Sequence, residues 1–325
     1  MIGPETLYRT NVGVEGAREA FEDVFNARAE LQSIYAKSFL DIDNFETLFG
    51  AVEMAAIIGK LGQRDAESIT RLRENVVTLI VRTLEHCIRF PVADRRIKPP
   101  EPYDRFVGML YETMEFLRSR PDVSFITFNY DLALDYALHY MGTLGGFSYH
   151  LSDEANSQTM PLLKLHGSIN WGVCRRCNSI VARDISGLPY GDPLWLMHES
   201  VILDLGTNIN RQQHCGEPLN RVPVIVPPTW SKGSQYKDLG RVWAKAAAEL
   251  AAAENIFVVG YSMPETDSFF RYLYALGSQS TTKLRRFWVF DPDPDKSVEQ
   301  RMKTLIGQES KGMRSISLGT HSRML

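Results

Sequence analysis

The sequence predicts an α/β protein in which strands and helices alternate to build a doubly wound parallel sheet. Short apolar runs with strand character occur at 123–128, 161–166 and 256–260, and amphipathic helical patterns follow them. The run Ile256-Phe257-Val258-Val259-Gly260 is apolar throughout, as a central strand covered on both faces requires. About 120 residues with helical periodicity precede these strands, so we expect a helical N-terminal part.

Apolar residues in the N-terminal part recur at intervals of three and four, which places them on one face of a helix. Pro99 and Pro100 interrupt the pattern, and Pro121 ends it. The three apolar stripes consist of Phe45, Leu48, Phe49, Val52 and Ala55, of Ile69, Leu72, Val76, Ile80, Leu84 and Ile88, and of Phe106, Met109, Leu110, Met114 and Leu117. We interpret these stripes as core-packing faces.

The rest of the chain alternates strands with helices around one irregular stretch. After the strands at 123–128 and 161–166, a short strand at 224–226 precedes an alanine-rich helix at 237–253, and the run at 256–260 precedes a helix from about 266. Further strands are predicted at 287–290 and 314–318. The sequence therefore predicts a single domain over 1–325. It comprises a helical part (1–120), a sheet core (121–169 and 223–325) and a small insert (170–222).

Composition excludes several classes of protein. The net charge of −3 gives no basic surface for nucleic acid. No apolar run reaches the roughly 18 residues of a membrane span, and the start lacks the features of a secretory signal. Four cysteines in 325 residues do not form a disulfide scaffold. We predict a cytoplasmic protein with no membrane or nucleic-acid partner.

Polar side chains stand where two of the predicted strands end. Asn129 and Asp131 follow the strand at 123–128, and His166 ends the strand at 161–166. Ligands of open α/β sheets bind outside the carboxyl ends of the strands, so these side chains are candidates for one shared site. The alternatives are structural: Asn129 as a helix cap and His166 as a packed histidine.

Three of the four cysteines lie in the insert and suggest a zinc site. Cys174-Arg175-Arg176-Cys177 has the spacing of a zinc knuckle, and Cys215 is the third thiolate. A second knuckle would need cysteine at position 212, where the chain has Gln212. The fourth ligand is then His214, although adjacent ligands strain the loop, or His198. A degenerate insert without metal is the alternative.

Several motifs together resemble the sirtuins, and the divergent bacterial sirtuin-like family most closely. They span residues 44 to 295 in an order and spacing that match the family. The motifs are Thr127-Phe128-Asn129-Tyr130-Asp131, Leu165-His166-Gly167-Ser168, Cys174 to Cys177, Val226-Pro227-Pro228-Thr229-Trp230, Gly260-Tyr261-Ser262-Met263-Pro264-Glu265-Thr266-Asp267 and Phe290-Asp291-Pro292.

The resemblance implies a Rossmann-like core, a zinc-ribbon-like insert and an enzyme that consumes NAD. Asn129 and His166 would be the catalytic pair, and Asn129 and Asp131 would also contact NAD. An amide can fix a ribose hydroxyl and a water together, and an imidazole with an ordinary pKa near ~6.5 can take a proton at neutral pH. NAD-binding roles would also fall to Gly260, Ser262 and Asp291, although Gly260-Tyr261-Ser262 is equally a plain strand-to-helix turn.

Two departures from the sirtuin pattern refine this expectation. Residues 1–44 offer no strand with a glycine-rich phosphate loop, which suggests a late chain start and weakened NAD binding. Pro227 and Pro228 stand where sirtuins bind a peptide strand, and proline cannot donate ladder hydrogen bonds, so water is favoured as the acceptor.

We therefore predict an NAD glycohydrolase of the type associated with antiphage defence. A partner protein or a homo-oligomer is expected by resemblance. The alternatives are a protein deacylase or ADP-ribosyltransferase on the same scaffold, and a non-catalytic nucleotide sensor or scaffold.

Overall fold

The structure is a computed structural model that describes residues 17–32, 40–42, 44–118, 122–142, 146–152, 159–185, 198–226, 237–264, 268–291 and 297–305. It confirms the predicted fold class: parallel strands alternate with helices, a helical part precedes them, and a small cysteine-containing insert lies between the strands. Among the described helices, none has the length and apolar character of a membrane span. The predicted strand at 314–318 lies outside the described residues.

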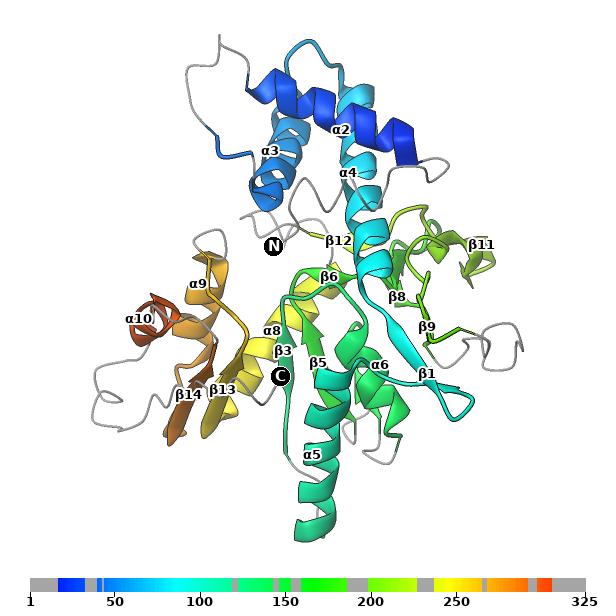
Figure 1. The fold of residues 1–325 in the computed structure, drawn as a ribbon. Coiled ribbons are helices and arrows are strands. Elements are labelled where there is room, and N and C mark those ends of the chain that lie inside the picture. Colours follow the sequence, from blue (N-terminus) through cyan, green and yellow to red (C-terminus); the bar gives the residue numbers. More distant parts are fainter. Residues whose placement is uncertain are drawn as a thin grey trace.

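The helical part begins with a three-helix layer at one end of the molecule (Figure 1). Asn44 and Asp65 cap α3 and α4, because each side chain accepts a hydrogen bond from a backbone N–H of the first turn (2.9 Å for both). The apolar stripes predicted for α3 and α4 are buried together in one core cluster. The helices are α2 (Ala17–Leu31), α3 (Phe45–Ile58) and α4 (Ala66–Cys87).

A short antiparallel hairpin follows α4, which the helical pattern did not predict. It consists of β1 (Phe90–Ala93) and β2 (Arg96–Ile97), and β1 also pairs with β9 (Ser200–Val201). Helix α4 ends at Cys87, so Ile88, the last residue of the predicted stripe, is its C-cap. The hairpin therefore ties the helical part to the region around the insert.

Glu85, near the end of α4, makes a second tie to the same region. Its buried carboxylate accepts hydrogen bonds from the backbone N–H groups of Gly206 (2.6 Å) and Thr207 (3.1 Å), and it also contacts the Thr207 hydroxyl. Burial nevertheless raises the pKa of Glu85 to about 7, with the hydrogen bonds opposing the shift.

This raised pKa predicts a pH dependence of stability. Between pH 4.5 and about 7, Glu85 is more protonated in the folded chain than in the unfolded one, so its contribution to stability falls as the pH rises and levels off above 7. The shift corresponds to about 3 kcal/mol. We expect Glu85→Gln, which keeps the shape of the side chain without titrating, to remove this fall in the free energy of unfolding. Urea unfolding of both proteins from pH 5 to 7.5 measures that free energy. The prediction would be contradicted if the free energies of the two proteins changed with pH in the same way.

The parallel strands form two groups in the described part of the chain. One has the order β3-β5-β4 and the other pairs β13 with β14 (Figure 1). No described strand joins β3 to β13; instead, the side chains of Ile126 and Val258 pack in one apolar cluster. The strands are β3 (Phe125–Thr127), β4 (Phe147–Ser148), β5 (Met160–Lys164), β13 (Asn255–Val259) and β14 (Arg286–Phe290).

Helix α8 contacts both groups of strands and fixes the carboxyl end of β5. Its inner residues pack against Leu163 and Leu165, and Leu250 packs with the β13–β14 pair. The Trp243 indole N–H donates to the Leu165 carbonyl at 3.0 Å, directly before His166. The helices of this half are α6 (Ala133–Tyr140), α8 (Lys237–Ala252), α9 (Ser268–Gly277) and α10 (Ser297–Lys303).

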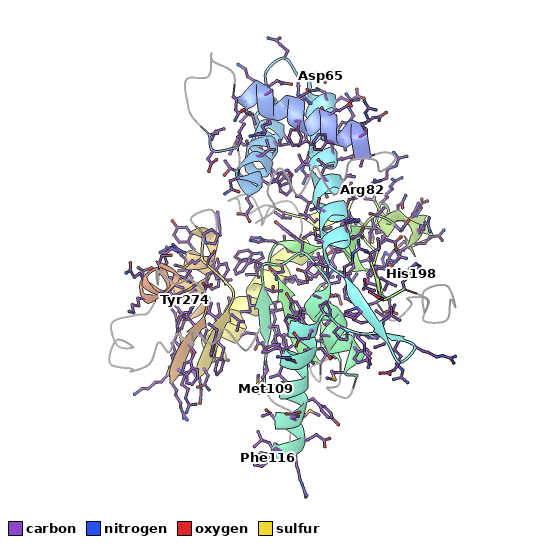
Figure 2. All side chains as sticks on the ribbon, in the orientation of Figure 1. Asp65, Arg82, Met109, Phe116, His198 and Tyr274 are labelled. Carbon is purple, nitrogen blue, oxygen red and sulfur yellow. The ribbon has the colours of Figure 1, made fainter. Side chains whose placement is uncertain are left out.

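Helix α5 (Glu101–Leu117) packs on α6 with its first half and projects from the body with its second (Figure 1). Met109 and Phe116 lie on the exposed part, and Phe116 is 85% exposed (Figure 2). Partly buried residues of its amino-terminal half pack in one cluster with Phe125 and Leu138, so this half of α5 lies beside β3 and α6.

The insert is a set of short antiparallel pairs after β5. Gly167 opens it with φ +86°, and a Cβ there would lie 2.1 Å from the Val224 carbonyl oxygen, so glycine is required where β6 meets β12. The strands are β6 (Gly167–Ser168), β7 (Trp171–Val173), β8 (Ile180–Ala182), β10 (Gln213–His214), β11 (Glu217–Pro218) and β12 (Val224–Ile225), and η2 (Ile209–Arg211) is a 3-10 turn.

Candidate functional site

The loop after β3 presents Asn129 and anchors its neighbours. The backbone N–H of Asn129 donates to Thr127 Oγ1 (3.1 Å), which turns the chain as the strand ends. Asp131 Oδ1 accepts from the Ala133 N–H (2.9 Å) at the start of α6. The carboxylate of Asp131 therefore stabilises the start of α6. The side chain of Asn129 is exposed and is not the cap of this helix.

His166 lies beside this loop, across the β3–β5 pair. The Leu165 N–H donates to the Thr127 carbonyl (3.0 Å), and the His166 carbonyl accepts from the Val226 N–H (2.9 Å). The imidazole is only 4% exposed. Its ring centroid lies 5.0 Å from that of Phe128 and 5.9 Å from that of Tyr130. The two aromatic residues that flank Asn129 thus both contact His166.

Phe128 also connects this pair to the end of β13. Its ring stacks on Tyr261 with centroids 4.5 Å apart and planes 14° from parallel. Gly260 directly precedes Tyr261, adopts φ +62°, and donates its N–H to the Phe290 carbonyl (2.9 Å) beside Asp291. The carboxyl ends of β3, β5, β13 and β14 therefore lie around one set of rings.

Ser262 is exposed, and its backbone carbonyl accepts from Arg301 Nε at 2.9 Å. Asp291 is half-buried at the end of β14. Thr266, where the sequence predicts that a helix begins, lies outside the described residues. The structure therefore brings Gly260 and Asp291 together and places both next to the ring cluster of Phe128 and Tyr261.

Sequence reasoning missed the aromatic residues of this site. Phe128 and Tyr130 enter the sequence analysis only as parts of a strand and a motif, although both contact the His166 ring. The sequence does carry a signal for their role, because aromatic residues flank Asn129 on both sides and another follows Gly260. Ligand pockets are lined mainly by apolar and aromatic side chains around a few polar groups, so rings beside polar candidates indicate a pocket wall.

Tyr103 of α5 also reaches this loop. Burial raises its pKa to about 12, helped by the nearby Asp131 carboxylate and opposed by a side-chain hydrogen bond with Asn129. The pKa of Asp131 is likewise raised, chiefly by burial, while Lys164 lowers it in part. No sequence pattern indicated Tyr103, since it lies on a helix 26 positions before Asn129.

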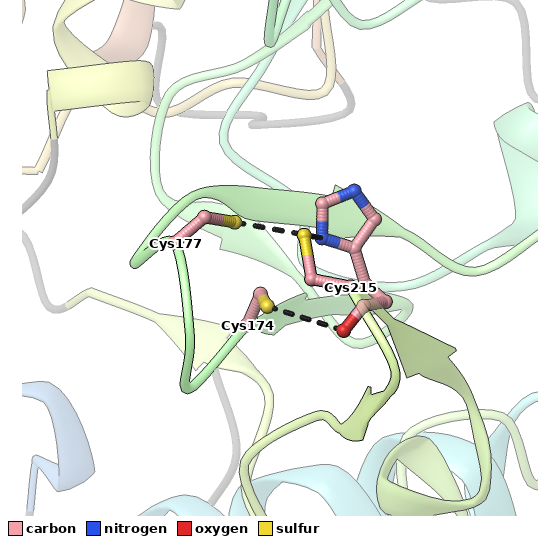
Figure 3. A group of neighbouring side chains, drawn as sticks. Cys174, Cys177 and Cys215 are labelled. Atoms are coloured by element: carbon pink, nitrogen blue, oxygen red, sulfur yellow. Dashed lines mark hydrogen bonds between the residues drawn. The ribbon is translucent and has the colours of Figure 1, made fainter.

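The four predicted zinc ligands meet at the tip of the insert (Figure 3). The ligand atoms of Cys174, Cys177, His214 and Cys215 all lie within 4.8 Å of one another. His214 Nδ1 is 3.5 Å from Cys177 Sγ and 3.3 Å from Cys215 Sγ. Zinc bonds of about 2.0–2.3 Å in a tetrahedron place ligand atoms roughly 3.5–3.8 Å apart, so the group fits zinc.

The loop geometry explains how adjacent residues can both serve as ligands. Cys215 adopts φ +54° and Gly216 φ +82° in the tight turn between β10 and β11, which directs the side chains of His214 and Cys215 to the same side. His198, the other candidate for the fourth position, is exposed and is not part of the group (Figure 2). His214 is therefore the fourth member.

No protein-family model matches the chain, and no curated protein matches it. Solved structures that resemble it include Sir2 homologues. A mutant Sir2 homologue bound to ADP-ribose is 16% identical, with 74% of this chain and 76% of that chain covered and a TM-score of 0.36. A Sir2 homologue bound to NAD is 17% identical, with 74% and 77% covered and a TM-score of 0.35. At these scores we base the functional proposal on the residues of the site.

Proposed function

We propose that the protein consumes NAD by cleaving the bond between nicotinamide and ribose, with water as the acceptor. The observation that carries the proposal is the contact of Phe128 and Tyr130 with His166, which holds the Asn129 loop against the imidazole at the carboxyl ends of the strands. This is the edge at which open α/β sheets bind nucleotides.

The proposed reaction uses Asn129 and His166 on one ribose. The electron pair of the C1′–N bond leaves with nicotinamide and creates positive charge on the ribose. The Asn129 amide donates to and accepts from a ribose hydroxyl and a water, which fixes the attacking oxygen. His166 takes the proton of that water as the new C1′–O bond forms, and ADP-ribose results. The rings of Phe128 and Tyr130 keep bulk water from the imidazole.

The nucleotide half of NAD fits the ends of β13 and β14. Apart from its two chain neighbours, no atom of the described residues lies within 4 Å of the position that a Cβ would take at Gly260, so a phosphate can approach the backbone there. Ser262 offers a hydroxyl close by, and the Asp291 carboxylate can accept from an adenosine ribose hydroxyl. Asp131 would orient the nicotinamide amide or the loop around it.

The cellular role that we propose is antiphage defence through NAD depletion, alone or with a partner protein or further copies of the chain. The resemblance to the divergent bacterial sirtuin-like family supports this role. Pro227 and Pro228, which favour water over a peptide acceptor, lie outside the described residues.

Product analysis separates this function from its alternatives. The protein is incubated with NAD alone and with NAD plus an acetyl-lysine peptide, and nicotinamide, ADP-ribose and modified peptide are quantified. The proposal predicts equal amounts of nicotinamide and ADP-ribose from NAD alone. Nicotinamide release only with peptide would establish a deacylase or a transferase, and no turnover in either mixture would favour a sensor or scaffold.

A further inference from the structure

We propose that Lys164 is a positioning residue of this site, because its buried ammonium group sets the conformation of the Asn129-Tyr130-Asp131 loop. The inference rests on the proposed function for its effect on rate. Its effect on the loop can be measured without any turnover.

The ammonium group of Lys164 joins three elements that meet at the site. Lys164 ends β5 two residues before His166 and pairs with Thr127 of β3. Its Nζ donates to the Asp131 backbone carbonyl, and to Asp135 of α6 at 2.9 and 3.1 Å. One group therefore holds the strand of His166, the loop of Asn129 and the first turn of α6 in a fixed relation.

The burial of this group is unusual for a lysine. The side chains of Lys164 and Asp135 are both 1% exposed. Lysine is almost never fully buried, and a buried ion pair often adds little stability over apolar residues of the same size. The buried ammonium of Lys164 is therefore better explained by a role in specifying one conformation than by a role in stability. The loop that it holds carries Asn129, the residue that we assign to the ribose.

The partners of Lys164 are themselves fixed by a hydrogen-bond chain. The Tyr149 hydroxyl donates to Asp135 Oδ1 (2.6 Å), and Asn170 Nδ2 donates to the Tyr149 oxygen (3.2 Å). These hydrogen bonds hold the Asp135 carboxylate in place independently of the Asn129 loop. The ammonium interacts with the carboxylates of both Asp135 and Asp131, and a further carboxylate, that of Asp184, acts on Tyr149. The Asp131 carbonyl is thus held by a cation that is itself anchored.

A matched pair of variants isolates the ammonium group. Asp135→Asn keeps an oxygen for Tyr149 and Lys164, and adding Lys164→Met to it removes the ammonium without leaving a buried charge at position 135. Steady-state kcat and KM for NAD, thermal unfolding, and hydrogen exchange of the backbone amides at 128–133 are measured for wild type, the single variant and the double variant.

We expect Asp135→Asn to lower kcat about fivefold, because the ammonium stays in place but loses its paired carboxylate. The double variant is expected to lose a further ~10²-fold in kcat, because a displacement of about 1 Å in a positioned group has effects of this size. Its KM should change only a few-fold, since Gly260, Ser262 and Asp291, which would hold the nucleotide half of NAD, lie outside the loop. The amides at 128–133 should exchange at least ~10-fold faster, while the rest of β5 stays protected.

A folded double variant with kcat within threefold of Asp135→Asn and unchanged exchange would overturn the inference. If it does not fold, Lys164→Arg takes its place: its longer, planar group keeps the charge but cannot hold the Asp131 carbonyl in the same position, so kcat should fall about tenfold. Wild-type kcat in Lys164→Arg would then overturn the inference. A wild type without NAD turnover would refute the proposed function, and the exchange data would still decide whether Lys164 fixes the loop.

Discussion

Replacing His166 by alanine is expected to lower kcat for NAD cleavage by about 10²–10⁴-fold, the range that a positioned general base contributes. His166 lies two residues after the end of β5, and the rings of Phe128 and Tyr130 contact its imidazole. No other described histidine ring occupies that position. Nicotinamide release from NAD under single-turnover conditions measures the effect.

Two further variants make this result interpretable. His166→Gln keeps much of the volume between the two rings but cannot act as the base, so it should fold like wild type and lose a similar factor. His86→Ala removes an exposed histidine of α4 and should leave the rate within twofold. Wild-type turnover by a folded His166→Gln protein would show that the imidazole takes no part in the reaction.

The insert is expected to bind one zinc ion per chain, and its tip is expected to lose its structure without the ion. The tip has few apolar contacts of its own, with Cys174, Ile209 and Leu219 as its buried cluster, so metal bonds must supply most of its stability. Zinc binding contributes about 10–16 kcal/mol in small zinc-dependent modules. Cys177→Ala should therefore reduce bound zinc to background and open the tip, residues 174–178 and 212–219, to proteolysis.

His198→Ala is the matched control for the metal, because His198 is an exposed histidine outside the group. Metal analysis should give the wild-type zinc content for this variant, whereas His214→Ala should lower the affinity and increase zinc loss to a chelator. A Cys177→Ala chain that keeps stoichiometric zinc, or a wild type purified with none and stable without it, would contradict the assignment.

The elements that could be predicted from the sequence are those whose signal is local. The apolar stripe from Ile69 to Leu84 predicts α4, because each turn of the helix places an apolar residue on the same face. The β-branched and aromatic runs located β3 and β13. Cys174 and Cys177 at knuckle spacing, together with Cys215, predicted a zinc-binding group, because few residue types bind zinc. The sequence left the fourth ligand open between His214 and His198.

The elements that the sequence did not reveal depend on contacts between distant segments. The pairing of β1 with β9 joins residues more than 100 positions apart. Lys164 reads as an ordinary strand residue until Asp131 and Asp135 are placed around it. Tyr103 approaches Asn129 only because α5 packs on α6. The division of the parallel strands into two groups likewise depends on packing between side chains, which periodicity does not report.

The central claim is that Asn129 and His166 act on the same ribose, and a double-mutant cycle tests it most directly. NAD cleavage is measured as kcat/KM for folded wild type, Asn129→Ala, His166→Ala and the double variant. Groups that act as one unit in a transition state have strongly non-additive effects, so we predict that each single variant loses at least ~10²-fold and that the double variant is at most about tenfold worse than the poorer single. Losses that simply multiply, or wild-type kcat/KM in either single variant, would contradict it.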